Sequence, residues 1–509
     1  MKGYLHIGAG ALLTLVLLLL ATINLGSVPP LWWDEGWTLT LARTWVEQGH
    51  YGRLLAGHLA PPGLEAAFPV TAPIALSFYL FGVGVWQGRL VGVFFTLGTL
   101  ALIYHLARRL YDRSVAIGTL AVLLLMSPYS SMHPVLIGRQ VLGEMPSLFY
   151  LLAGYACFLP ALQKPPWFML AAVGLWGIAL IAKAQVLPFW TASLLVPLSV
   201  TLLRRNWRLA GLLGMGALGS LVVFRLLPGL QQHLLYGHTI PGSPVHGLYD
   251  VTALVPVGSA RLFALIATLL FGLPTLLGLC YATWQFIEDR DKAALGVDLE
   301  VVRLALLVLA GSWFAWYLLL SVGWVRYLFP ATLIGSIFVA AMLRDLTDRF
   351  SLPSTIERSG SALRHLRFDR HSVGALLAIV LIALIVPATS CMLYQAYVVE
   401  ADASALQVAD FLNTQTAPEA LVETYDSELF FLLNRRYHYP PDQIHVELDR
   451  RTFLDQDVPI DYDPLAADPD YLVVGPHSKL WRLYSPVLAT GAFRLLHSYS
   501  RYKVYERVR

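Results

Sequence analysis

The chain has 509 residues, of which 57% are hydrophobic and only 14% are charged, with a net charge of +3. A soluble domain carries roughly 25% charged residues, and one soluble core stops growing near about 250–300 residues. The composition therefore excludes a single soluble domain and indicates a surface covered largely by lipid. The three cysteines lie apart within apolar segments, which argues against a disulfide framework or a cysteine-based zinc site.

Apolar segments long enough to cross about 30 Å of hydrocarbon recur along the chain. We interpret the first, residues 7–25 after Lys2, as a retained helix, because it is longer than a secretory signal and lacks a clear cleavage site. The sequence predicts about eleven spans in all, the others near residues 89–107, 114–132, 146–162, 167–183, 186–203, 209–227, 262–286, 302–321, 327–343 and 373–396.

Basic residues gather on one side of this layout, at residues 108–113, 204–208 and 344–370. The positive-inside rule then places the N-terminus in the cytoplasm and the segment after the last span outside, in the plasma (inner) membrane of the cell. The apolar run at 64–85 would reverse this charge pattern if it crossed the membrane. Prolines at 61, 62, 69 and 73 interrupt it, so we predict helices lying in the outer interface, within a first outer loop of residues 27–88.

The composition becomes that of a soluble domain from about residue 399. Asp402 is predicted to cap a helix through Asn413, and Asp426 a second helix. Strands are predicted at 420–424, 444–448 and 471–474, followed by a helix near 478–484 and a terminal strand pair near 493–508. The prediction is therefore an α-helical polytopic membrane domain at 1–398, followed by a small extracytoplasmic α/β domain at 399–509.

Two acidic clusters are predicted to lie at the outer face. Asp34 and Glu35 follow the first span within Trp32-Trp33-Asp34-Glu35-Gly36-Trp37. A tryptophan belt with Asp34 as a helix cap explains the tryptophans but leaves two adjacent carboxylates unexplained. Glu144 lies on the outer loop before the fourth span, after His133 and Arg139. Glu144 either pairs with Arg139 at the start of a helix or serves a reaction.

Two cations complete the predicted outer face. Lys183 ends the fifth predicted span, and Arg326 lies beside Tyr327 in a very short loop; contact with lipid headgroups is the alternative role of both. An acid can accept a proton from an attacking hydroxyl, and cations can hold a departing phosphate. Together, these residue types suit transfer of a group from a lipid-phosphate carrier. The outer histidines at 58, 233, 238 and 246 have no metal-ligand spacing, so we predict no metal site.

These residues resemble the polyprenyl-phosphate-dependent glycosyltransferases of the GT-C fold, in particular bacterial relatives of protein O-mannosyltransferases and of the lipid A aminoarabinose transferase. The resemblance covers roughly residues 1–340. Its pieces are Trp33-Asp34-Glu35, the Pro61-Pro62 turn, Arg89, the Arg108–Arg113 loop, Arg139 with Gly143-Glu144-Met145-Pro146, and Arg326-Tyr327 with Pro330.

The resemblance implies an inverting glycosyltransferase that needs no cofactor. Its partners would be a polyprenyl-phosphate-linked sugar donor, a lipid, glycan or protein acceptor, and membrane lipid, but no nucleic acid. Asp34 would be the general base, with Glu35 and Glu144 as further catalytic acids. The remaining assignments are Lys183, Arg326, Arg139 and Tyr327 to the carrier phosphate, and Trp33, Trp37, His58 and His133 to the acceptor or sugar cleft.

Two other classes of function remain open from the sequence. A transporter or flippase of a lipid-linked glycan would have broken helices and charges near mid-membrane, whereas here the acids lie at the outer boundary. A non-catalytic scaffold would use these acids only as helix caps.

Overall fold

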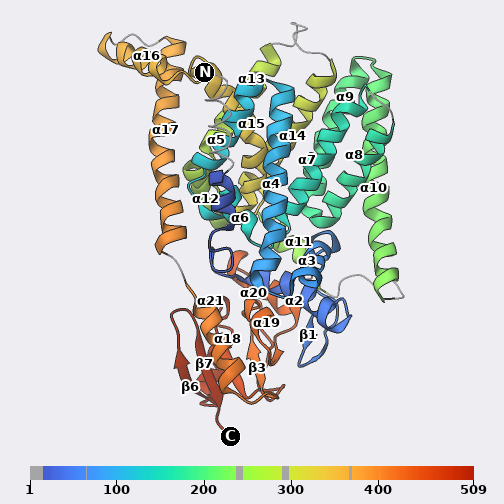
Figure 1. Ribbon diagram of the computed structural model, residues 1–509, viewed down its shortest axis with the longest axis vertical. Helices are drawn as coiled ribbons and strands as arrows, with labels where there is room; N and C mark the ends of the chain where they lie inside the picture. Colours follow the sequence, from blue (N-terminus) through green and yellow to red (C-terminus); the bar gives the residue numbers. More distant parts are fainter. Residues whose placement is uncertain are drawn as a thin grey trace.

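A computed structural model describes residues 15–64, 66–163, 166–236, 245–288, 297–365, 369–399 and 402–509. A bundle of long helices occupies one part of the molecule, and an α/β domain lies at one end of the bundle (Figure 1). Lys2 and the first half of the predicted span at 7–25 lie outside the described residues. The described remainder of that span is helical over residues 15–22.

The bundle confirms an α-helical membrane protein. Seven helices of the described residues are long and apolar enough to cross a membrane, and α5 and α8 are shorter apolar helices. The total of eleven spans stays a prediction. The bundle contains α4 (Val85–Leu110), α5 (Arg113–Leu125), α7 (Glu144–Ala161), α8 (Trp167–Ala182), α9 (Leu187–Leu203), α10 (Trp207–Tyr236), α12 (Gly258–Ala267), α13 (Leu273–Glu288), α14 (Val297–Leu319), α15 (Phe329–Leu346) and α17 (Arg370–Tyr394).

One predicted span is shorter than expected. The segment 114–132 forms α5 only as far as Leu125, because the residue before Pro128 is disfavoured in a helix. A short 3-10 helix, η1 (Ser130–Met132), and α6 (Pro134–Arg139) follow it. The turn therefore brings α6 to the same end of the bundle as the α/β domain (Figure 1).

Short elements of the first loop lie between the bundle and the α/β domain (Figure 1). They are α2 (Trp33–Gln48), the hairpin of β1 (Leu54–Leu55) and β2 (His58–Leu59), and α3 (Phe68–Phe81). The 14 residues of α3 extend only about 21 Å, which is less than the about 30 Å of a hydrocarbon core. The length of α3 agrees with an interfacial helix, as predicted for residues 64–85. A further short helix, α11 (Leu248–Thr252), lies at the same level.

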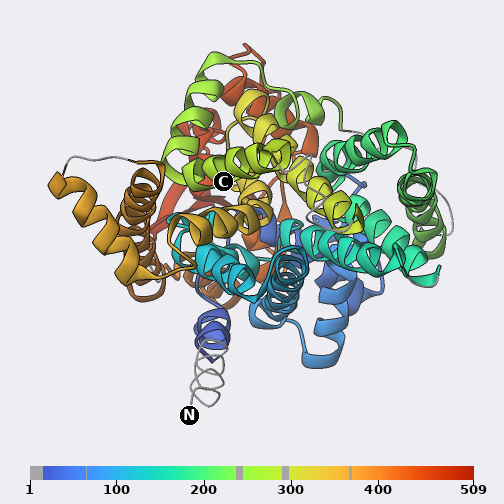
Figure 2. The same ribbon diagram turned by 90° about the horizontal axis from the view of Figure 1, so that it is seen from above.

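The opposite end of the bundle carries basic loops. Arg344, in the last turn of α15, donates to Asp112 before α5 at 2.9 Å. The helix α16 (Leu352–His365) lies at the level of this end, to one side of the bundle (Figure 1). Seen from above, α16 and α17 form one edge of the bundle, and α8 to α10 form the other (Figure 2). The basic loops and the α/β domain are thus at opposite ends, as the charge pattern predicts, and which end faces the cytoplasm stays a prediction.

The C-terminal domain is α/β, as predicted. Its sheet has the order β4-β3-β5-β7-β6, in which β3 is parallel to β4 and β5, and β7 is antiparallel to β5 and β6. The strands are β3 (Leu421–Thr424), β4 (Arg436–His438), β5 (Tyr471–Val474), β6 (Phe493–Ser498) and β7 (Lys503–Arg507). The helices are α18 (Ser404–Gln415), α19 (Glu428–Leu432), α20 (Asp442–Phe453), α21 (Pro476–Leu480) and α22 (Ser485–Ala489).

Two local predictions in this domain are wrong. The predicted strand at 444–448 lies inside α20, where Ile444, Val446 and Leu448 are all buried. The period-two pattern arises because α20 is covered on two sides, by its own domain and by the membrane domain. Asp426 does not cap α19; its carboxylate accepts from the backbone of Gly475 at 2.9 Å and of His477 at 2.8 Å, at the start of α21. Asp402 lies one residue before the N-cap residue Ala403 of α18, and its carboxylate accepts from the Ser404 backbone at 3.0 Å.

The two parts share one hydrophobic core across their boundary. Trp33 and Trp37 of α2 belong to the same buried cluster as the core of the C-terminal domain. The indole of Trp33 donates to the Tyr425 carbonyl at 2.9 Å, and Arg53 pairs with Asp442 at 2.6 Å. Residues on both sides of the predicted boundary near residue 399 therefore belong to one hydrophobic core. The C-terminal domain packs directly on the first loop.

Candidate active site

The first acid of the predicted site forms an ion pair across the sequence. Asp34 lies in the first turn of α2, and Arg326 lies on η5 (Val325–Leu328), just before α15. Nη1 of Arg326 donates to Oδ2 of Asp34. The guanidinium also packs over the Trp32 ring at 4.9 Å and the Trp324 ring at 5.5 Å. The side chains of Asp34 and Arg326 are 28% and 16% exposed, so both remain accessible.

A second acid–cation pair lies beside the first. Glu144 begins α7, and Lys183 occupies an extended break between α8 and the next helical turn. Nζ of Lys183 donates to Oε1 of Glu144 at 2.5 Å. The ring of Tyr327 lies 5.6 Å from Nζ of Lys183 and 5.6 Å from Cζ of Arg326. Tyr327 thus joins the two pairs into one site, and the four predicted charges meet at one end of the bundle.

The charges of this site are balanced in the structure. Two carboxylates face two cations, so an additional anion would have to compete with the acids for the cations. A guanidinium can hold two phosphate oxygens at once, whereas an ammonium acts as a point charge. An arriving phosphate can therefore take Arg326 and release Asp34. The arrangement can bind an anionic group and at the same time free a proton acceptor.

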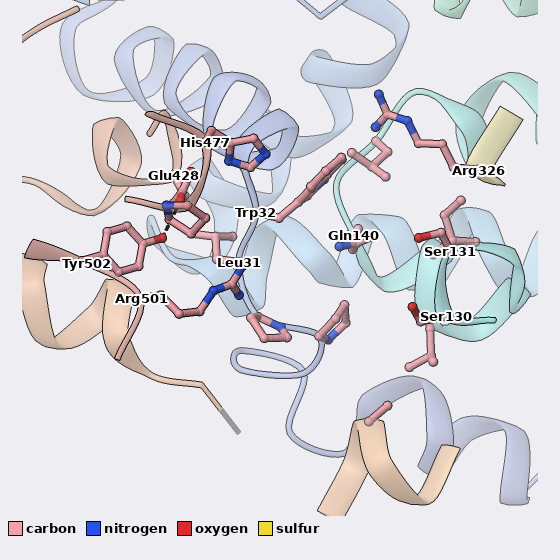
Figure 3. Close-up of a pocket in the computed structure, with 17 residues that line it drawn as sticks. Leu31, Trp32, Ser130, Ser131, Gln140, Arg326, Glu428, His477, Arg501 and Tyr502 are labelled. Carbon is pink, nitrogen blue, oxygen red and sulfur yellow. Dashed lines mark hydrogen bonds between the residues drawn. The ribbon is translucent and has the colours of Figure 1, made fainter. Parts of the chain in front are cut away.

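A cavity of about 250 Å³ lies next to Arg326. Trp32, Gln140 and Arg326 line it from the membrane domain, and Glu428, His477, Arg501 and Tyr502 line it from the C-terminal domain. Figure 3 shows Arg326 on one side of this cavity and Glu428, Arg501 and Tyr502 on the other. The volume is just under the about 300–1,000 Å³ of ligand pockets. Both parts of the chain therefore build the space beside the paired charges.

One group of the described residues could hold a metal ion. Ligand atoms of Asp426, Glu428 and His477 lie within 4.8 Å of one another. Burial and the charge of Asp426 raise the pKa of Glu428 to about 7. Burial opposes the charge on His477, but the Asp426 carboxylate, 3.7 Å from its Nδ1, and the charge of Glu428 raise its pKa overall. Because Asp426 already accepts three protein donors, the group also works as a cap at the start of α21, and the absence of a metal stays a prediction.

Glu35 has a different role from the one predicted. It is fully buried, and Arg89 donates to both of its oxygens, at 2.9 and 2.7 Å. The backbone of Val141 donates to it as well, at 3.1 Å. Arg89 also donates to the carbonyls of Leu25 and Pro29 at 3.0 and 2.8 Å. Glu35 therefore holds the first loop against α4, and the catalytic assignment of this residue is not supported.

Arg139 and His133 also lie away from the predicted site. The guanidinium of Arg139 is fully buried and donates to the carbonyls of Leu20 and Ile23, at the end of the first helix. His133 is fully buried, with its Nε2 3.2 Å from the Leu124 carbonyl oxygen. Both residues hold backbone segments in place, so their assignments to the phosphate and to the cleft are corrected.

The aromatic and histidine residues assigned to a cleft serve the domain interface or the surface. Trp33 and Trp37 are at most 9% exposed, and their rings contact each other at 4.5 Å within the shared core. His58 lies on the exposed hairpin strand β2 and pairs in register with Leu55. The predicted cleft is therefore formed by other residues. Trp32 and Trp324, whose rings contact Arg326, are residues that sequence reasoning missed. The available signal was their position, two residues before Asp34 and two residues before Arg326.

The helical bundle with its docked α/β domain has the GT-C fold, which confirms the fold expected from the resemblance. The chain is similar to ArnT from Cupriavidus metallidurans bound to undecaprenyl phosphate, with a TM-score of 0.64 and 17% identity over 98% of each chain. The apo state of that protein gives a TM-score of 0.61 and 17% identity, over 99% of this chain and 98% of that one.

A more distant similarity is to AglB, an archaeal oligosaccharyltransferase from Archaeoglobus fulgidus in complex with an inhibitory peptide and a dolichol-phosphate. Its TM-score is 0.54 and its identity 12%, covering 100% of this chain and 75% of that one. Residues 68–227 match the family model described as dolichyl-phosphate-mannose-protein mannosyltransferase. No curated protein matches the chain by sequence.

Proposed function

We propose that this protein is a membrane glycosyltransferase, which transfers a sugar from a polyprenyl-phosphate carrier to an acceptor hydroxyl at the extracytoplasmic face. The observation that carries the proposal is the Asp34–Arg326 pair beside the Glu144–Lys183 pair. The similar structures bound to undecaprenyl phosphate and to dolichol-phosphate support a lipid-phosphate carrier. The match to the mannosyltransferase family model supports sugar transfer.

Carrier binding is the first step. The carrier phosphate displaces the Asp34 carboxylate from Arg326 and the Glu144 carboxylate from Lys183. Arg326 holds two phosphate oxygens, and Lys183 adds its charge. Trp32 and Trp324 keep the guanidinium in place through their ring contacts. Binding of the donor thus prepares the base, because Asp34 is freed only when the phosphate is present.

Transfer follows as a single displacement. The acceptor oxygen attacks the anomeric carbon, and its proton passes to the Asp34 carboxylate. A bond forms between the acceptor oxygen and that carbon, while the bond from carbon to the phosphate oxygen breaks with its electron pair going to the phosphate. Attack opposite the leaving group inverts the anomeric configuration. Because a phosphate is a weak base, Arg326 and Lys183 stabilise its departure without a strong general acid.

A reconstituted assay tests the proposal. Purified protein is placed in sealed vesicles with a radiolabelled polyprenyl-phosphate sugar pool from membrane extracts, and glycan acceptor fractions are added. We expect free polyprenyl phosphate and a labelled acceptor with the wild type. Arg326→Ala should lose carrier binding and transfer, and Arg364→Ala, on α16 at the far end of the bundle, should behave as the wild type. Movement of the intact labelled lipid from one leaflet of the vesicle membrane to the other, without transfer of the sugar, would instead identify a flippase.

A further inference from the structure

One face of α20 points from the C-terminal domain towards the paired charges. His445, Asp449 and Phe453 follow one another at intervals of four residues, so they lie on the same side of the helix. The His445 ring stacks on Trp33 at 4.6 Å, next to Asp34 in the chain. The Phe453 ring contacts Trp324 at 5.2 Å, two residues before Arg326. Asp449 lies between these two contacts and therefore faces the Asp34–Arg326 pair.

The electrostatic surroundings of Asp449 agree with this placement. The charges that act on it are those of Asp34 and Arg326. In turn, the charge of Asp449 acts on the hydroxyls of Tyr327 and of Tyr425. Asp449 is thus an acid of the C-terminal domain that interacts with the site of the membrane domain.

Asp449 is buried without a bonding partner. It is 1% exposed, and among the described residues neither of its oxygens has a hydrogen-bond donor. Nε2 of His445 is the nearest cation candidate, at 3.5 Å. Burial lowers the pKa of His445 to about 4, so this imidazole is neutral at physiological pH and does not compensate the acid.

A buried polar group without a partner is unfavourable for folding, and such groups are typical of functional sites. Burial first, and then the charge of Asp34, raise the pKa of Asp449 to about 7. Two neighbouring carboxyl groups are also able to hold a hydroxyl group between them, because a carboxylate accepts hydrogen bonds and a carboxylic acid donates one.

We propose that Asp449 is a binding residue for a carbohydrate hydroxyl, supplied to the active site by the C-terminal domain. A hydroxyl that approaches Asp34 would be held by Asp449 and oriented next to the base. The inference rests on the proposed function, and the hydroxyl belongs either to the donor sugar or to the acceptor. The C-terminal domain would then complete the substrate site as well as cover it.

The test uses Asp449→Asn in the full-length protein, with Glu447→Gln on the same helix as the control. Two probes are bound: undecaprenyl phosphate alone, and the glycosylated carrier pool. We expect unchanged binding of undecaprenyl phosphate and a loss of transfer by about ten- to a hundredfold, the value of a hydrogen bond to a charged group. Weaker binding of the glycosylated carrier assigns the hydroxyl to the donor. Unchanged binding with an increased KM for the acceptor assigns it to the acceptor.

Two results would overturn the inference. One is transfer by Asp449→Asn at the wild-type rate. The other is a lower unfolding temperature than the wild type at pH 8, which would make Asp449 a structural group. If the wild type binds no undecaprenyl phosphate and transfers no sugar, the proposed function fails. In that case the unfolding temperatures of Asp449→Asn and the wild type at pH 8 still show whether the Asp449 carboxylate has a stabilising partner in the folded protein.

Discussion

At the scale of single residues, neighbouring acids have opposite roles. Consecutive residues of a helix point about 100° apart, so Asp34 faces Arg326 while Glu35 faces Arg89. The first pair is partly exposed and can exchange its partner for a phosphate. The second is fully buried, with both oxygens bonded to one guanidinium. Accessibility, rather than the type of residue, therefore separates the proposed base from the structural acid.

Removal of Glu35 should affect stability before activity. Glu35→Ala leaves Arg89 buried without its partner, which typically costs about 3–5 kcal/mol. We expect a large fall in the unfolding temperature of the purified protein and a low folded yield. Glu47→Gln, at the exposed end of α2, should change little, because an exposed helical pair contributes only about 0.3–0.5 kcal/mol. Equal stability of both variants would contradict the structural role of Glu35.

The pH dependence of stability should reveal Asp449. Its pKa is about 7 in the folded protein and near about 3.9 in an unfolded chain. As the pH rises, the unfolded chain releases this proton at about pH 4, whereas the folded protein keeps it until about pH 7. Asp449 therefore makes the folded protein less stable as the pH rises from about 4 to about 7. The unfolding temperature of Asp449→Asn relative to the wild type should therefore rise over this range and level off above it. A difference that is independent of pH would contradict this burial.

At the scale of elements, the close contact of α2 with α19 fixes the C-terminal domain. A Cβ atom at Gly36 would lie 2.1 Å from the Ser427 carbonyl oxygen, which is backbone and cannot turn aside. The Ser427 hydroxyl also donates to the Trp33 carbonyl. The first loop therefore packs directly against the backbone of the second domain at the residues next to Asp34.

Gly36→Ala should weaken this docking. Overpacking of this kind typically costs about 1–3 kcal/mol, so we expect faster proteolysis of the C-terminal domain and a lower unfolding temperature. Gly211→Ala, in α10, is the matched control, because a Cβ there meets nothing within 4 Å. If both variants resist proteolysis equally, the contact between α2 and α19 does not control docking.

The elements also show what the sequence can predict. Long apolar runs identified the bundle helices, because length and hydropathy depend on neighbouring residues only. The segment 444–448 was misassigned, since α20 is buried on two sides and imitates a strand. The roles of Arg139 and His133 were missed because their partners are backbone carbonyls, which leave no mark in the sequence.

At the scale of the whole molecule, the site is assembled from distant segments. Asp34 and Arg326 are 292 residues apart, and Glu144 and Lys183 are 39 apart. Charged residues near helix ends predicted these four side chains, but no local pattern predicts which acid meets which cation. Asp449 was missed altogether, because its relation to Asp34 exists only when the C-terminal domain is docked.

The sidedness of the molecule can be tested by labelling. In a variant without the three native cysteines, Arg494→Cys on β6 should react with a membrane-impermeant maleimide in intact cells. Glu357→Cys on α16 should react only after the membrane is opened. The reverse pattern would contradict the positive-inside assignment and place the proposed chemistry on the cytoplasmic face.

The most direct measurement is sugar transfer by Asp34→Asn in the reconstituted assay. The substitution keeps the shape of the side chain but removes its capacity to accept the proton. The account predicts that this variant inserts, unfolds near the wild-type temperature and still binds undecaprenyl phosphate, while transfer falls at least about a hundredfold, as for loss of a general base. Wild-type transfer by a correctly folded Asp34→Asn protein would contradict the account.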